Sequence, residues 1–111
     1  MDNILINAPK VIKIGPYDYT LQFRDDEWSR ATGHAGQCDS EKLIITIYDR
    51  LSLRNVAAVF IHEVMEAFQH QREHTGQITP HQAIEDTEWA ITEVFARNPE
   101  VLAWWVKLIT A

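Results

Sequence analysis

Three side chains in the segment FIHEVMEAFQHQREH, residues 60 to 74, have the types and spacing of a metal site. In an α-helix, residues four apart lie above one another, so His62 and Glu66 would project from the same side and could bind one cation. Glu63 is rotated by about 100° from His62, close enough to contact a water molecule on that cation without being a ligand. The H-E-x-x-E pattern therefore predicts two metal ligands, His62 and Glu66, and one general base, Glu63.

A catalytic zinc site has three protein donors and a water molecule, so a third ligand is needed. His81 is the first candidate, because the chain between Glu66 and His81 is long enough to fold back. Glu88 and Glu85 are the alternates, and Glu88 could instead orient a ligand histidine. Two imidazoles and one carboxylate suit Zn2+, and Mn2+ or Fe2+ also bind such donors.

Two interpretations without a catalytic metal stay open. His70 and His74 are also four residues apart and could form an adventitious surface site. Alternatively, His62 and the neighbouring glutamates could be an ordinary polar helix face, where a histidine is usually just hydrogen-bonded.

Apolar residues recur at helical spacing around the motif. They predict a helix at about residues 53–74, capped by Ser52 or Asp49. A second helix begins with Thr79 as its cap and Pro80 as its first residue, and its expected buried stripe is Ile84, Ile91 and Phe95. Asn98-Pro99 ends that helix and starts a third, whose apolar residues can pack on the core.

The first half of the chain has the alternation of β-strands. Val11 to Ile14 and Tyr17 to Phe23 flank Gly15-Pro16 and predict a hairpin. A polar segment follows as a loop or short helical turn. A second hairpin turns at Asp39 to Lys42 and continues into Leu43 to Tyr48, a strand expected to be buried on both faces. The fold class is therefore α+β, with a small antiparallel sheet followed by three helices.

Length and composition fit one domain, with residues 1–10 as an N-terminal tail and 11–111 as the folded unit. The 46% hydrophobic content is ordinary for a globular core, and no apolar run is long enough to span a bilayer. The net charge of -6, with scattered Lys and Arg, argues against direct nucleic-acid binding. The lone Cys38 is expected to be structural, and the cytoplasm is the expected location.

The order of these motifs resembles the minimal zincin-like proteins encoded by phages and prophages. The matching pieces are KIGPYDY, GQCDSEKLIITI, IHEVMEAF and HQAIEDTEWAITEVFARNP, which cover most of the chain from Lys13 to Pro99. The resemblance implies a zincin-type fold for 11–111, with His62, Glu66 and His81 on the metal positions and Glu63 on the base position. Glu66 departs from the H-E-x-x-H pattern of the better-known metallopeptidases.

Two functions follow from the motif and the resemblance. The first is a zinc-dependent peptidase of phage or prophage type, in the cytoplasm of the host cell, with Leu43 to Tyr48 as an edge strand that pairs with a peptide. Tyr48 and His34 are the candidates for stabilising an oxyanion. The alternative is a catalytically weak or inactive zincin fold that binds a host or phage protein, with Trp104-Trp105 as an exposed anchor. The oligomeric state is not indicated by the sequence.

Overall fold

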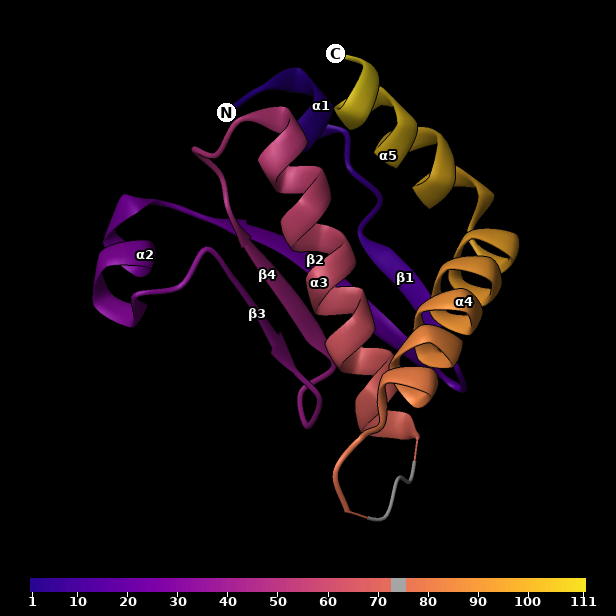
Figure 1. Cartoon of the computed structure of the whole chain (residues 1–111). Helices are drawn as coiled ribbons and strands as arrows, with labels where there is room; N and C mark the ends of the chain where they lie inside the picture. Colours follow the sequence, from indigo (N-terminus) through magenta and orange to yellow (C-terminus); the bar gives the residue numbers. More distant parts are fainter. Residues whose placement is uncertain (73–75) are drawn as a thin grey trace.

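The computed structural model describes residues 1–72 and 76–111 and forms two layers, a sheet covered on one face by helices (Figure 1). The sheet has four strands in the order β1-β2-β4-β3. Their bounds are β1 Val11–Ile14, β2 Tyr17–Arg24, β3 Gly36–Asp39 and β4 Ile44–Tyr48.

The sheet is mixed, which corrects the expected all-antiparallel arrangement. The two hairpins β1/β2 and β3/β4 are antiparallel, as predicted, but β2 and β4 pair in parallel with Thr20 opposite Ile44. Two hairpins joined in this way place β4 inside the sheet and β3 at its edge. The prediction of an edge strand at Leu43 to Tyr48 is therefore wrong, although Ile45, Thr46 and Ile47 are buried as expected.

Five helices complete the described chain. Their bounds are α1 Asn3–Ile6, α2 Asp26–Thr32, α3 Leu53–Gln71, α4 Pro80–Arg97 and α5 Pro99–Thr110. The three long helices follow the sheet in sequence, as predicted, and α3 crosses one face of it (Figure 1). Ser52 caps α3, and Thr79 with Gln82 forms the predicted capping box of α4. The part of the predicted helix at residues 73–74 lies outside the described residues.

Residues 1–10 belong to the folded unit and are more than a tail. Leu5 is 2% exposed and lies in the main core, and the Trp104 indole donates to the Ile4 carbonyl over 2.9 Å. This contact joins α1 to α5, so both ends of the chain lie side by side at one end of the molecule (Figure 1). Among the described residues, no helix is long and apolar enough to cross a membrane.

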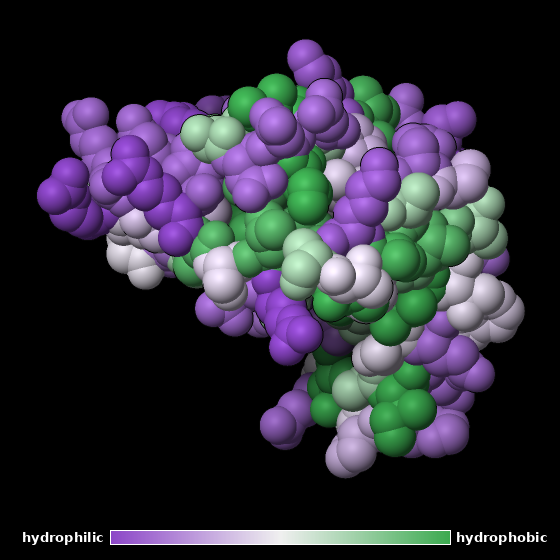
Figure 2. Space-filling model, turned by 90° about the horizontal axis from the view of Figure 1, so that it is seen from above, coloured by the Kyte–Doolittle hydropathy of each residue, from purple (hydrophilic) through white to green (hydrophobic). Residues whose placement is uncertain are grey.

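The core lies between the sheet and the long helices. Ile12, Ile45 and Ile47 contribute from the sheet, and Val56 and Phe60 from α3, all with no exposed surface. Figure 2 shows hydrophobic groups on the side of the molecule where α4 and α5 lie, and mostly hydrophilic groups on the side of α2. On α3, the side chain of Glu63 faces Gly36 of β3.

The buried face of α4 differs from the predicted one. Ile84 is 66% exposed and Ile91 is 39% exposed, whereas Asp86, Ala90 and Val94 are buried. Small side chains at 90 and 94 allow α4 to pack closely against α3. Ile84 is left outside, Ile91 lies at the margin of this contact, and Phe95 is partly buried against the core, as predicted. Glu88, one of the alternate ligands, is also exposed.

Candidate metal centre

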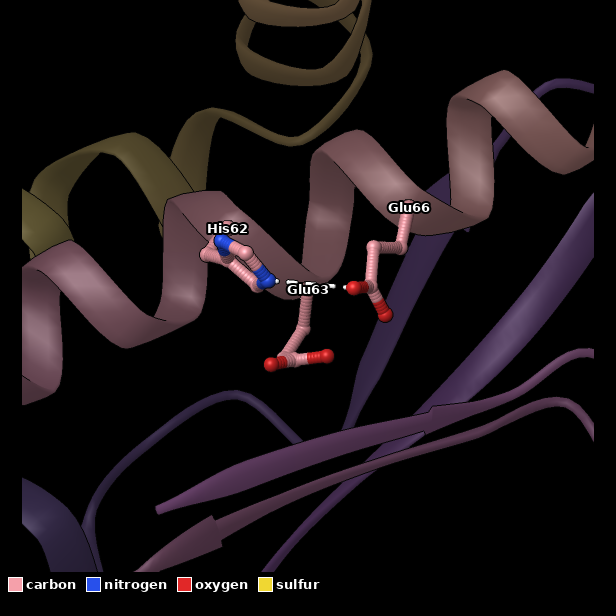
Figure 3. A group of neighbouring side chains, drawn as sticks. All are labelled: His62, Glu63 and Glu66. Atoms are coloured by element: carbon pink, nitrogen blue, oxygen red, sulfur yellow. Dashed lines mark hydrogen bonds and ion pairs between the residues drawn. The ribbon is translucent and has the colours of Figure 1, made fainter. Parts of the chain in front are cut away.

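One turn of α3 brings together three of the predicted residues. His62, Glu63 and Glu66 each offer a donor atom, and these atoms lie within 4.8 Å of one another. The Nε2 atom of His62 is 3.0 Å from an oxygen of Glu66, as expected for residues four apart on a helix. Figure 3 shows His62 and Glu66 side by side on the helix, while Glu63 points toward the strands.

The three side chains differ sharply in exposure. The side chains of His62 and Glu66 are 68% and 52% exposed, whereas Glu63 is 4% exposed. Burial, the negative charge of Glu66 and a hydrogen bond with it raise the pKa of Glu63 from 4.5 to about 7. A cation between these carboxylates would offset the unfavourable charge, so the donor set fits a divalent metal.

Glu63 lies where α3 approaches strand β3 most closely. A Cβ atom added to Gly36 would lie 2.4 Å from Cγ1 of Val59 and 2.9 Å from Oε2 of Glu63. Glycine is therefore needed for this approach. Together with Ala35 and Ala58, these residues and His62 line a cleft of about 380 Å³ that opens beside the carboxylate.

His81 does not join this cluster. Its Nε2 atom is 2.8 Å from an oxygen of Glu85 on the next turn of α4, and its side chain is 81% exposed. Among residues 1–72 and 76–111, His62, Glu63 and Glu66 are the one group of three His, Cys, Asp or Glu side chains whose donor atoms lie close enough to share a metal ion. Of the alternates, Glu85 thus pairs with His81, and Glu88 lies on an exposed part of α4. Of the predicted pair His70 and His74, His74 lies outside the described residues.

Several residues near the site have other roles. The Tyr48 hydroxyl donates to Asp26, which also forms a 3.2 Å ion pair with Arg50, so Tyr48 is occupied in holding α2 against the sheet. His34 is exposed on the segment between α2 and β3. No described contact directs either side chain to the three-residue cluster.

Cys38, which the sequence predicts to be structural, lies beside the cluster of His62, Glu63 and Glu66. It packs against the core, and burial is the main cause of a raised pKa of its thiol. The negative charges of Glu63 and Glu66 contribute to the same shift, which places Cys38 beside the cluster on strand β3. Its sequence contains no motif that could have indicated this proximity.

The predicted pair Trp104-Trp105 is not an exposed anchor. Trp104 is 5% exposed and stacks edge-on against Phe60, with ring centroids 5.3 Å apart. The Trp105 indole donates to the Ala57 carbonyl over 3.1 Å and its ring packs on Phe95. Both rings therefore complete the core, and they do not support the binding-module hypothesis.

Comparison of the chain with protein-family models, with curated proteins and with solved structures finds no match. The class that the structure itself defines is an α+β fold with a mixed sheet, and a cluster of one histidine and two glutamates on its central helix.

Proposed function

We propose that this chain is a metal-dependent hydrolase of the zincin-like kind and that it acts on peptides. The observation that carries the proposal is the position of Glu63, buried between two exposed donors and facing the cleft beside an edge strand. A carboxylate that only completed a polar helix face would be solvated. Its burial next to a second carboxylate is costly unless a cation shares the site.

His62 and Glu66 are the proposed protein ligands, because their donor atoms are exposed and 3.0 Å apart. One imidazole and one carboxylate supply two of the three protein donors of a catalytic zinc site, and manganese or iron is also compatible with them. A divalent cation bound there would polarise a substrate carbonyl and lower the pKa of water toward 7.

Glu63 is the proposed general base. Its carboxylate faces the cleft and can accept a proton from the attacking water, and it can return that proton to the leaving amine. A base must be ionised, and the charge of a neighbouring cation lowers the pKa of Glu63 from about 7. His62 and Glu66 would hold the cation, and Glu63, which hydrogen-bonds with Glu66, would carry the proton.

Strand β3 supplies the proposed docking surface for the peptide. Tyr48 donates its N–H to the Ala35 carbonyl, so by antiparallel alternation the backbone groups of Gly36 and Cys38 point outward. An extended peptide can pair with these groups as an additional strand. Gly36 also lines the cleft with Glu63, so a peptide bound there would pass the proposed base.

The first test is the metal content of the purified protein, measured by elemental mass spectrometry. About one zinc per chain is expected, with loss in His62→Ala and Glu66→Ala and retention in the matched variant His70→Ala. His81→Ala should also retain the metal, because His81 pairs with Glu85 outside the cluster. A wild-type protein that binds no divalent metal would overturn the proposal.

The second test separates binding from turnover. Glu63→Gln should keep the metal and lose hydrolysis of a mixed peptide library by a factor of about 100 or more. Glu93→Gln, an exposed glutamate on α4, is the control and should cleave normally. Unchanged cleavage by Glu63→Gln would exclude Glu63 as the base.

A further inference from the structure

A second cavity lies beyond the end of strand β3, near the C-terminal end of α3. It has a volume of about 780 Å³, and its lining includes the aromatic residues Tyr17, Tyr19 and Phe68 and the charged residues Glu41 and Arg72. We call it the distal cavity. Its size is within the range of small-ligand sites, and its lining combines aromatic rings with a few polar groups.

The walls of the distal cavity are held by contacts to other elements. Tyr19 is 1% exposed and its hydroxyl is 3.4 Å from Oγ of Ser40, which fixes one side. On the other side, the Arg72 guanidinium lies 5.8 Å from the centre of the Phe68 ring. Nε of Arg72 is also 3.2 Å from the buried Asp86 on α4. The cavity is therefore preformed.

The distal cavity and the cleft beside Glu63 lie along the same strand. Gly36 lines the cleft, and Ser40, directly after β3, lines the distal cavity. Four residues of extended chain cover about 13 Å. Side chains four apart in an extended peptide point to the same side, so one peptide on β3 could present one residue to each cavity.

We propose that the distal cavity binds an aromatic side chain of an extended peptide, four residues from the peptide residue opposite Gly36. The rings of Tyr17 and Phe68 and the Arg72 guanidinium offer faces and edges for stacking, which favours an aromatic ring over an aliphatic side chain. The peptide's role as a substrate rests on the proposed function. The aromatic preference of the distal cavity does not depend on it.

Binding of N-acetyl-L-phenylalanine methylamide tests the preference directly. The titration is followed by amide chemical shifts of the metal-free Glu63→Gln protein, with the corresponding alanine and lysine compounds alongside. We expect saturable shifts at Tyr17, Ser40 and Phe68, and at least about tenfold tighter binding of the phenylalanine compound. Equal binding of the three compounds, or shifts confined to other surfaces, would overturn the proposal.

Two variants and a control locate the binding. Ser40→Trp should fill the distal cavity and abolish the shifts, and Tyr17→Ala, at a 48% exposed residue, should weaken binding without unfolding. Gln37→Ala, at an exposed residue of strand β3, should bind normally. Normal binding by Ser40→Trp and Tyr17→Ala would contradict the assignment. Because no metal or turnover is involved, lack of hydrolysis would remove the proposed function and leave this result intact.

Discussion

Strands β1 and β3 both lie at an edge of the same sheet, but side chains cover outward backbone groups of β1 and leave those of β3 open. Asn98 accepts a hydrogen bond from Lys13 N–H and donates one to the Lys13 carbonyl, each over 2.9 Å. At the turn end of β1, Gln71 donates, also over 2.9 Å, to the carbonyl of Ile14, a residue whose backbone groups face β2. Within residues 1–72 and 76–111, the outward groups of Gly36 and Cys38 receive no such bond.

An unpaired edge strand is a site for pairing with another chain, and proteins usually block it. Here the edge far from the candidate site is covered at Lys13 by Asn98, the residue between α4 and α5. The edge beside Glu63 is open, and a buried carboxylate with a raised pKa lies behind it. Among the described residues, β3 is therefore the edge with unpaired outward groups, as the proposed peptide docking requires.

The largest expected effect on stability comes from removing the Asn98 side chain, which covers Lys13 of edge strand β1. Asn98→Ala removes the two bonds to Lys13 and a third, over 2.7 Å, to the Val94 carbonyl, in a residue that is 1% exposed. The loss should be about 3 kcal/mol of unfolding free energy, measured by denaturant titration. Sedimentation should also show self-association, because β1 would then be available to pair.

Asn7→Ala is the matched control, since its side chain donates only to the exposed Asn3 carbonyl. It should change stability by no more than about 0.5 kcal/mol and remain monodisperse. If Asn98→Ala behaved like Asn7→Ala, the protection of β1 by Asn98 would be of no consequence.

The second effect concerns the open edge. Gly36→Ala introduces a Cβ that would lie 2.4 Å from Cγ1 of Val59, so strand and helix must separate. The cost should be about 1 to 3 kcal/mol in unfolding free energy, with weakened metal binding because Glu63 also moves. Adding Val59→Ala should recover part of the stability in a double-mutant cycle, and strictly additive losses would contradict this contact.

The third prediction uses the buried carboxylate behind the open edge. Burial and Glu66 raise the pKa of Glu63 to about 7, so the folded state binds a proton more readily than the unfolded state. In metal-free protein, stability should therefore fall as pH rises from 4.5 toward 7. Glu63→Gln should remove this decline and melt higher than wild type above pH 7.

Thermal melts at several pH values, with Glu93→Gln as the control, measure this difference. The exposed Glu93 carboxylate should leave the pH profile unchanged. Parallel profiles for wild type and Glu63→Gln would show that Glu63 does not titrate differently in the folded state.

The smallest effect is expected at the end of β1. Gln71→Ala removes the bond to the Ile14 carbonyl and should cost about 1 kcal/mol in unfolding free energy. Gln69→Ala, a partly buried residue on the same helix, serves as the control. A loss at position 71 as large as that of Asn98→Ala would mean that the two residues protect β1 equally.

Local signals predicted much of this fold. The caps at Ser52 and Thr79 and the break at Asn98-Pro99 depend on neighbouring residues, so the sequence could indicate them. The cluster of His62, Glu63 and Glu66 lies within one helical turn, and the same reasoning placed its members together.

Features that depend on distant contacts were not predictable in this way. The parallel pairing of β2 with β4 joins two hairpins and decides which strand is at the edge. Two sets of apolar residues on α4 could face α3. Packing against α3 buries the set with the smaller side chains, Ala90 and Val94. The position of His81 depends on how α4 lies relative to α3, which spacing alone could not determine.

The hydrogen bonds between Asn98 and Lys13 of β1 also bear on the synthesis of the chain. Asn98 follows Lys13 by 85 residues, so its two bonds to β1 can form only after that whole stretch has left the ribosome. Until then the nascent sheet has two open edges, a state prone to aggregation. A translational pause or truncation before Asn98 would therefore expose β1, and chaperone demand should be greatest just before α5 emerges.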